Sequence, residues 1–244
     1  PWVIAHRGAS SIAPENTASS FKSAKALGAE WVEFDVMLTA DRIPIVFHDL
    51  SLARITRLQK NVNRVPSNLV KDLDAGTWFS SQFKDERIPT FKEIVQICAD
   101  LELGINVELK PRAFTTAALV DVVLDTLEAF WPKTCPEPLL SSFSWPCLMA
   151  VRRRNPNIAL GLLLASPRPG WACFARYLKA RSVHIDLNTV NQAFVDVVHG
   201  MGKKVAVYTV NSSIDAKRCQ MLGVDAVFTD YPQRLLSERS KLCS

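Results

Sequence analysis

The sequence predicts an α/β protein, a (β/α)₈ TIM barrel with a small insertion after the second strand. Short apolar segments alternate with segments of helical periodicity, eight such pairs are spread along the chain, and 244 residues suit one undivided barrel. The alternative is a doubly wound open sheet. It is weakened because the first strand is not followed by the G-x-G-x-x-G turn that dinucleotide-binding sheets of that kind carry.

The amino-terminal elements set the pattern. The first strand is predicted at residues 3–6. A helix follows with Asn16 as the expected N-cap and ends at Gly28, because Asn favours the cap position and Gly the position after a helix. The second strand, residues 29–36, is followed by a short turn and an apolar segment that returns the chain to His48.

Residues 50–89 break this alternation. They are rich in Arg, Asn, Ser and Asp and show no clean period, so we expect an inserted subdomain within one domain that covers residues 1–244. The alternation then resumes. Strands are predicted at residues 105–109, 139–143, 159–164, 182–186, 203–208 and 225–229. Helices are predicted at residues 90–102, 115–130, 145–154, 171–180, 191–201 and 212–222, and after Pro232.

The composition is that of an ordinary globular protein, with 48% hydrophobic and 22% charged residues. No apolar run approaches the roughly 20 residues that span a bilayer, so we expect a soluble protein without stable membrane insertion. The six cysteines are scattered and form no C-x-x-C pair, which favours a reduced, cytoplasmic setting. Their even number leaves a periplasmic or secreted location open.

The net charge of +5 is modest, and the densest basic stretch is Arg152–Arg154. We expect these arginines to end a helix, where cations offset the helix dipole. Aromatic residues are not interleaved with them, so nucleic acid is not an expected partner. The sequence does not define the oligomeric state, and a homodimer is compatible with it.

Polar side chains gather at the predicted strand ends, where barrel enzymes carry their functional groups. The first strand ends in His6 and is followed by Arg7. Glu33 and Asp35 are two residues apart in the second strand and therefore point to the same side. The returning segment brings His48 to the same end. Two histidines in neighbouring segments could share the proton transfers of one reaction.

A third carboxylate is expected in the same place. Glu108 and Lys110 repeat the two-residue spacing at the end of the strand at 105–109. Together with Glu33 and Asp35, Glu108 supplies hard oxygen ligands for one divalent cation, Mg²⁺ or Ca²⁺, between which the sequence does not choose. Zinc is disfavoured because no Cys or paired-His ligand spacing is present. Positive charge beside a carboxylate-bound cation suits an anionic group, above all phosphate.

Eight segments, in order from His6 to Pro232, carry a resemblance to a known family: AHRGAS, APENT, GAEWVEFDVMLTADRIPIVFHD, LDAGTWF, IPTFKEI, INVELKP, YTVN and VFTDYP. By these the chain resembles the glycerophosphodiester phosphodiesterases. The resemblance implies a (β/α)₈ barrel with a small insertion after the second strand. It also implies metal-dependent hydrolysis of small-molecule phosphodiesters, such as glycerophosphocholine or glycerophosphoethanolamine, to sn-glycerol 3-phosphate and an alcohol. His6 and His48 match the family's acid/base pair.

The same resemblance assigns the charged residues. Glu33, Asp35 and Glu108 match the family's metal ligands. Arg7 and Lys110 match its phosphate contacts, although Lys110 could equally balance the charge of Glu108.

Two further residues are expected at the substrate. Glu15 either favours the start of the following helix electrostatically or, as the family pattern places it, lies near the active-site Arg and His. Tyr208 occupies a position at which the family often has Trp, which keeps an aromatic wall and adds a hydroxyl group. Asn211, shortly after it, is expected to cap the next helix.

Two other functions use the same residues. A lysophospholipase D would act on lysolipids at this site and would need an apolar groove around the insertion. A catalytically silent barrel would bind glycerophosphodiesters without cleaving them. The presence of both histidines and all three acidic ligands argues against the silent barrel.

Overall fold

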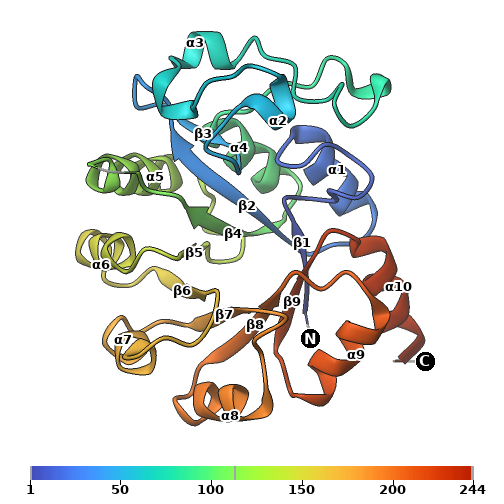
Figure 1. The fold of residues 1–244 in the computed structure, drawn as a ribbon, viewed down its shortest axis with the longest axis vertical. Coiled ribbons are helices and arrows are strands. Elements are labelled where there is room, and N and C mark those ends of the chain that lie inside the picture. The colour runs from blue at the N-terminus through green and yellow to red at the C-terminus, as the bar shows by residue number, and fades with distance from the viewer. Residues whose placement is uncertain (1, 113, 243–244) are drawn as a thin grey trace.

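The computed structural model describes residues 2–112 and 114–242 and shows, within them, a closed barrel of eight parallel strands ringed by helices (Figure 1). The barrel strands are β1 (Trp2–His6), β2 (Trp31–Leu38), β4 (Gly104–Leu109), β5 (Leu139–Ser142), β6 (Ala159–Leu164), β7 (Ser182–Asp186), β8 (Lys204–Tyr208) and β9 (Ala226–Thr229). Strand β1 closes the barrel because it pairs in parallel with both β2 and β9. The predicted (β/α)₈ fold is confirmed, and the open sheet is excluded.

Helices cover the outside of the barrel. They are α1 (Ala18–Ala26), α4 (Phe91–Asp100), α5 (Thr116–Phe130), α6 (Trp145–Arg154), α7 (Trp171–Tyr177), α8 (Gln192–Gly200), α9 (Ser213–Met221) and α10 (Pro232–Leu242). Strand residues alternate between the interior and the helix layer. On β2 the outward-facing Phe34 packs against Phe21 of α1 and Phe91 of α4, with ring centroids 5.5 and 6.2 Å away. These buried contacts fix the strand whose inward face carries two of the expected site residues.

A hairpin and an insertion follow β2. Strand β3 (Pro44–Val46) returns antiparallel to β2. The chain then forms α2 (Ala53–Thr56), η1 (Val62–Arg64), α3 (Ser67–Val70) and η2 (Ser81–Phe83) before it enters α4. Their buried side chains pack with Met37 and Ile45 of the hairpin in a small core of their own. Figure 1 shows the insertion at the top of the barrel, over the end of β2.

The cap of α1 differs from the prediction. Asn16 is not the cap; Thr17 is, and its hydroxyl accepts a hydrogen bond from the backbone N–H of Ser20. Asn16 is buried at a φ of 60°, and its amide donates to Asp35 at 3.0 Å. Asn and Thr are both good caps, so local preference could not separate two adjacent residues.

His184 of β7 lies buried in the interior of the barrel. The imidazole lies across Gly161 of β6, where a Cβ atom would stand 2.6 Å from the ring, so a larger residue does not fit. Its Nε2 is 2.8 Å from the hydroxyl of Ser182, and burial lowers the pKa of His184 to about 3. His184 is therefore a neutral residue of the barrel interior.

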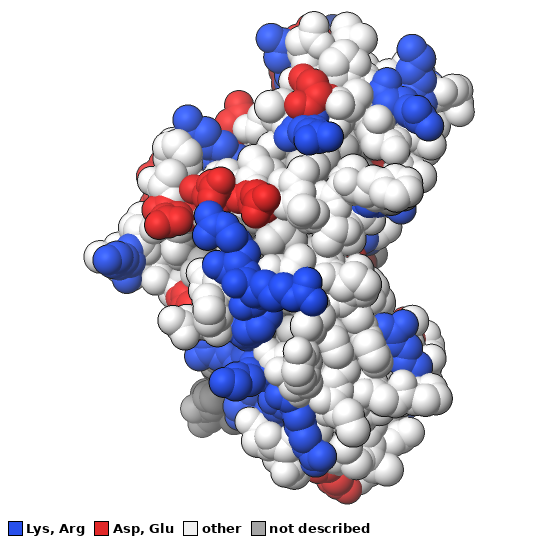
Figure 2. Space-filling view, turned by 90° about the vertical axis from the view of Figure 1, so that its left-hand side faces the viewer, with Lys and Arg blue, Asp and Glu red and all other residues white. Residues whose placement is uncertain are grey.

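The Arg152–Arg154 stretch forms the last turn of α6, as predicted. Figure 2 shows Lys and Arg side chains gathered in a band on this side of the molecule, below a group of acidic ones. Arg154 pairs with two acids of α5, since its guanidinium lies 2.8 Å from Asp125 and 3.8 Å from Asp121. Among the residues described, none of the helices has both the length and the apolar character needed to cross a membrane.

Candidate active site

Three acidic side chains meet at the carboxyl ends of two neighbouring strands. Glu33 and Asp35 come from β2 and Glu108 from β4, and the parallel register places Asp35 directly opposite Glu108. Each offers one carboxylate oxygen, and these oxygens lie within 4.8 Å of one another. Such a group of hard oxygen ligands can hold a metal ion.

Two cationic side chains border the acidic group. The ammonium of Lys110 lies 2.8 Å from a carboxylate oxygen of Glu108 and 3.2 Å from one of Asp35. On the other side, Nε of Arg7 is 3.5 Å from Asp35, and the backbone N–H of Arg7 donates to Glu33 at 3.1 Å. The carboxylates are thus enclosed between a lysine and an arginine.

The neighbouring cations do not offset burial and carboxylate crowding at the two glutamates, and the pKa values of Glu33 and Glu108 lie above their ordinary values. Burial and then the charges of Asp35 and Glu108 raise the pKa of Glu33 well above its ordinary value. Burial and then Asp35 raise the pKa of Glu108 to about 7. Burial acts in the same direction on Asp35, but Lys110 and Arg7 outweigh it and hold the pKa of Asp35 below its ordinary value. Two crowded carboxylates thus take up protons readily, and a hard divalent cation fits this donor set.

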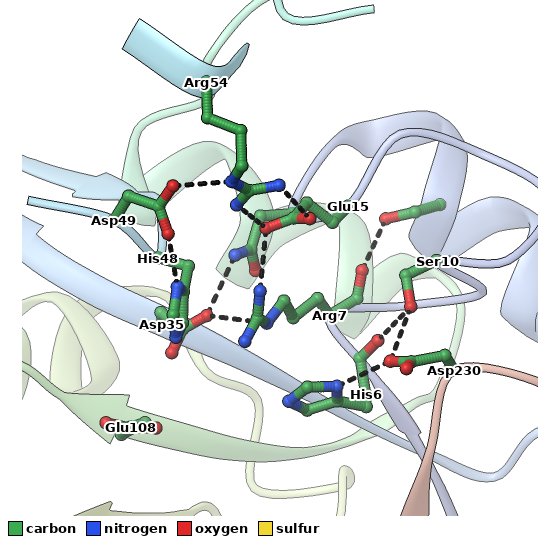
Figure 3. Close-up of polar contacts among 12 residues, drawn as sticks. His6, Arg7, Ser10, Glu15, Asp35, His48, Asp49, Arg54, Glu108 and Asp230 are labelled. Atoms are coloured by element: carbon green, nitrogen blue, oxygen red, sulfur yellow. Dashed lines mark hydrogen bonds and ion pairs between the residues drawn. The ribbon is translucent and has the colours of Figure 1, made fainter. Parts of the chain in front are cut away.

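His6, at the end of β1, forms a hydrogen bond with Asp230, which follows β9. Nδ1 of His6 is 2.7 Å from Oδ1 of Asp230, and Ser10 donates to the same oxygen at 3.0 Å (Figure 3). Asn211 donates to the other oxygen at 2.7 Å, so it supports Asp230 and is not the expected cap of α9; that cap is Ser212. Burial opposes ionisation, yet the hydrogen bonds from His6 and Asn211 lower the pKa of Asp230 to about 2.

His48, after the hairpin, has the same construction. Its Nδ1 is 2.7 Å from Oδ1 of Asp49. Burial lowers the pKa of His48; Asp35 opposes this effect, while Arg7 and Lys110 reinforce it. Each of the two predicted histidines therefore presents Nδ1 to a carboxylate, with Nε2 on the opposite side of the ring. Nε2 of His6 lies 3.8 Å from Oε2 of Glu33.

These side chains surround a cavity of about 160 Å³ at the carboxyl ends of the barrel strands. Its polar lining consists of His6, Arg7, Glu33, His48, Asn106, Glu108, Lys110, Ser141 and Thr209. Its apolar lining consists of Phe143, Leu163, Tyr208 and Phe228. The structure thus brings both predicted histidines and both predicted cations into one cavity, next to the acidic group.

Tyr208 stands in the apolar wall of this cavity. Its hydroxyl donates to the backbone carbonyl of Leu164 at 2.8 Å, so the hydroxyl group is bound to the barrel and the ring forms the wall. Phe143 meets this ring at 87° with centroids 6.0 Å apart. Phe143 was not among the predicted site residues.

Glu15 lies beside the cavity and is absent from its lining. It accepts a hydrogen bond from Arg7 at 2.9 Å and two from Arg54 of the insertion, at 2.7 and 2.9 Å. Burial opposes ionisation, but these two arginines lower the pKa of Glu15. Of the two predicted roles, proximity to the active-site arginine is the one that this geometry favours.

Three supporting residues were missed from the sequence. Asp49 and Asp230 both lie inside segments that carried the family resemblance. Asp49 directly follows His48, and Asp230 directly follows strand β9, so each segment contained a signal. Arg54 lies in the insertion, whose sequence shows no period and gave no signal.

The comparison with protein families agrees with this geometry. The model of the "Glycerophosphoryl diester phosphodiesterase family" matches residues 6–234. The chain belongs to this family. The match includes both histidines and all three carboxylates of the site.

Relatives of the family resemble the chain over nearly its whole length. A glycerophosphodiester phosphodiesterase of Caldanaerobacter subterraneus subsp. tengcongensis is 32% identical, with 96% of each chain covered. One of Bacillus altitudinis is 28% identical, with 98% of each covered. Among solved structures, an Oleispira antarctica phosphodiesterase in complex with the product sn-glycerol-3-phosphate matches with a TM-score of 0.94 and 35% identity, over 97% of this chain and 96% of that one.

Proposed function

We propose that this member of the family hydrolyses glycerophosphodiesters, such as glycerophosphocholine or glycerophosphoethanolamine, to sn-glycerol 3-phosphate and an alcohol. The observation that carries the proposal is the pair of histidines, each with a carboxylate at 2.7 Å from Nδ1, on a cavity that also contains an acidic group and two cations. The product bound to the similar Oleispira antarctica phosphodiesterase supports the choice of substrate.

The charged residues bind and orient the phosphodiester in this proposal. Arg7 and Lys110 line the cavity and offer positive charge to the phosphate oxygens. Glu33, Asp35 and Glu108 would hold Mg²⁺ or Ca²⁺, which when bound neutralises charge that develops on the phosphoryl group. The aromatic wall borders the less polar part of the substrate.

The two histidines move the protons. One accepts a proton at Nε2 from the nucleophile, which is water or the 2-hydroxyl of the glycerol. The other donates a proton from Nε2 to the departing alkoxide. Attack by the 2-hydroxyl would give a cyclic phosphate that water then opens. Asp230 and Asp49 accept from Nδ1 of His6 and His48 and keep each Nε2 directed at the substrate.

The deciding experiment measures release of glycerol 3-phosphate from glycerophosphocholine, with chelator and after return of Mg²⁺ or Ca²⁺. We expect activity that the chelator removes and a cation restores. Replacement of either histidine, by His6→Gln or His48→Gln, should reduce kcat by about 10²–10⁴-fold. Activity that is absent from the wild type with every cation, or unchanged in both variants, overturns the proposal. The same assay with lysophosphatidylcholine measures the lysophospholipase D alternative.

A further inference from the structure

We propose that Arg54, in helix α2 of the insertion, is a positioning residue that holds both the acid/base and the phosphate-binding halves of the site. This inference rests on the proposed function, and it extends that function to a residue outside the cavity. Arg54 acts through two carboxylates, Asp49 and Glu15. One of them supports His48 and the other supports Arg7.

The contacts of Arg54 are those of a planar fork between two acids. Its Nε donates to Oδ2 of Asp49 at 2.6 Å. Its two terminal nitrogens donate to the two oxygens of Glu15, at 2.9 and 2.7 Å. Figure 3 shows the guanidinium between these carboxylates, above the rest of the site. A guanidinium can make such paired contacts at fixed angles, whereas a lysine ammonium is a single point of charge.

Each carboxylate has a second contact that leads into the site. Asp49 uses Oδ2 for Arg54 and its other oxygen, Oδ1, for Nδ1 of His48 at 2.7 Å. Oε1 of Glu15 accepts from Arg54 and also from Arg7 at 2.9 Å. One carboxylate, Asp49, therefore links the guanidinium of Arg54 to the imidazole of His48. A second, Glu15, links it to Arg7.

Arg54 reaches the reaction only through these partners. None of Arg54, Asp49 and Glu15 is among the residues that line the cavity, although His48 and Arg7 both are. The side chain of Arg54 is 41% exposed, on the outer side of the two carboxylates. Arg54 is therefore placed to hold other residues of the site and not to bind the substrate itself.

The insertion holds Arg54 in place from its own core. The neighbouring residues Leu52 and Ile55 are buried there, and Arg54 lies 5.5 Å from the centre of the Trp78 ring, at cation–π distance. Trp78 packs against the same core, and its indole N–H donates to the carbonyl of Ala75. The insertion thus contributes a fixed cation to the site as well as a surface beside it.

Charge explains why a cation is needed at this point. Without Arg54, the half-buried carboxylates of Glu15 and Asp49 would keep, among the described residues, only Arg7 and His48 as their respective partners. The hydrogen bonds from Arg54 lower the pKa of both carboxylates, in each case against the effect of burial. Asp49 then stays an anionic acceptor for Nδ1–H of His48, and Glu15 stays an anionic partner for Arg7.

The kinetic test uses glycerophosphocholine as substrate and compares Arg54→Ala with Asp49→Asn and Glu15→Gln. It also includes two double variants, in which Arg54→Ala is combined with Asp49→Asn or with Glu15→Gln. Loss of the contact through Asp49 to His48 affects proton transfer, so it should lower kcat. Loss of the contact through Glu15 to Arg7 weakens phosphate binding, so it should raise KM. Arg54→Ala should lower kcat and raise KM. We expect kcat to fall by about 10–100-fold, the range for residues that hydrogen-bond to a ligating side chain and orient it. Each double variant should be no worse than the carboxylate variant alone in the parameter which that carboxylate controls.

Two further variants distinguish positioning from general damage. Arg54→Lys should restore part of the loss, because an ammonium can reach one carboxylate but cannot hold both. Arg64→Ala removes an exposed arginine from the same insertion and should leave kcat, KM and the unfolding temperature unchanged. Additive losses in the double variants would show that Arg54 acts independently of Asp49 and Glu15, and would overturn the proposal.

A readout without turnover separates failure of this inference from failure of the proposed function. Imidazole ¹⁵N NMR reports which nitrogen of His48 carries the proton. We expect one tautomer, with the proton on Nδ1, in the wild type and in Arg64→Ala, and a mixture in folded Arg54→Ala. An inactive wild type with this tautomer change would refute the proposed reaction alone. An unchanged tautomer in a folded Arg54→Ala protein would refute the role of Arg54.

Discussion

His6 and Asp230 form a pair across 224 positions of the sequence, with Nδ1 and Oδ1 2.7 Å apart. The pair exists because β1 and β9 are neighbours in the closed barrel, so the residues that end these strands meet at the same rim. The pKa of Asp230 is lowered to about 2, against the effect of burial, by the hydrogen bonds it accepts from His6 and its other neighbours. The closure of the barrel therefore supplies the anion that orients one of the two histidines.

Replacement of this carboxylate should reduce turnover. In Asp230→Asn the amide no longer demands a proton on Nδ1, so Nε2 of His6 loses its fixed role, and we expect kcat to fall by about 10²-fold or more. The matched control is Asp225→Asn, which alters a second His–Asp pair, with His199 at 2.8 Å, outside the cavity. Steady-state kinetics at a temperature where both variants are folded checks this. Equal losses in the two variants, or a normal kcat in Asp230→Asn, would contradict the assignment.

The acidic group should make stability depend on a divalent cation. A ligand at 100 times its Kd stabilises a folded protein by about 2.7 kcal/mol, which for a domain of this size corresponds to a rise in Tm of several degrees. We expect Mg²⁺ or Ca²⁺ to produce such a rise and EDTA to reverse it. Asp35→Asn removes a buried ligand and should abolish the effect, whereas Asp121→Asn, an exposed acid of α5, should not. A cation effect that persists in Asp35→Asn would place the ion elsewhere.

The parts of the site that follow from local spacing could be predicted from the sequence. Glu33 and Asp35 share a face because strand residues two apart do so, and Glu108 joins them because β2 and β4 are parallel neighbours in register. The barrel itself follows from the count and order of apolar segments. In each case a short-range pattern determines the result once strands are placed side by side.

The supporting residues could not be predicted in the same way. Asn16 is a good cap by local preference, yet its amide is directed at Asp35 because Thr17 takes the cap. Arg54 and Asp230 reach the site through tertiary contacts between distant segments, and no local periodicity encodes which segments meet. Sequence patterns therefore located the proposed reacting groups better than the groups that hold them in place.

The hydroxyl of Tyr208 should matter for stability more than for catalysis. It donates to the carbonyl of Leu164, so Tyr208→Phe should cost about 1 kcal/mol of unfolding free energy. The ring that forms the cavity wall remains, and kcat/KM should therefore fall less than in Tyr208→Ala. Tyr177→Phe, at an exposed tyrosine of α7, is the control and should not change the denaturation midpoint. A loss of kcat/KM in Tyr208→Phe as large as in Tyr208→Ala would mean that the hydroxyl contacts substrate.

In the protein without a bound cation, Glu108 should contribute less to stability as the pH rises towards neutrality. The pKa of Glu108 is about 7 in the folded chain and 4.5 for an ordinary glutamate, because burial and then Asp35 disfavour its charged form. Between these values the folded state keeps a proton on Glu108 that the unfolded state has released, so the contribution of this residue to the unfolding free energy falls as pH rises from about 4.5 to 7. Lowered pKa values act in the opposite direction: that of Asp35 below about pH 4, and that of His184, about 3 in the folded chain against 6.5 for an ordinary histidine, between about pH 3 and 6.5. The pH dependence of the whole protein combines these effects, so a variant of Glu108 is needed to isolate its share.

The difference in Tm between Glu108→Gln and the wild type isolates this effect. In EDTA, we expect the variant to gain stability relative to the wild type between pH 4.5 and 7, because glutamine has no proton to lose. At neutral pH a saturating divalent cation should reverse the order, since only the wild type has all three carboxylates to bind it. Thermal unfolding followed by circular dichroism at half-unit pH intervals measures both changes. A difference that stays constant across this range in EDTA would show that Glu108 is already ionised at the lower pH, and that the crowding of the three acids is relieved by some other means.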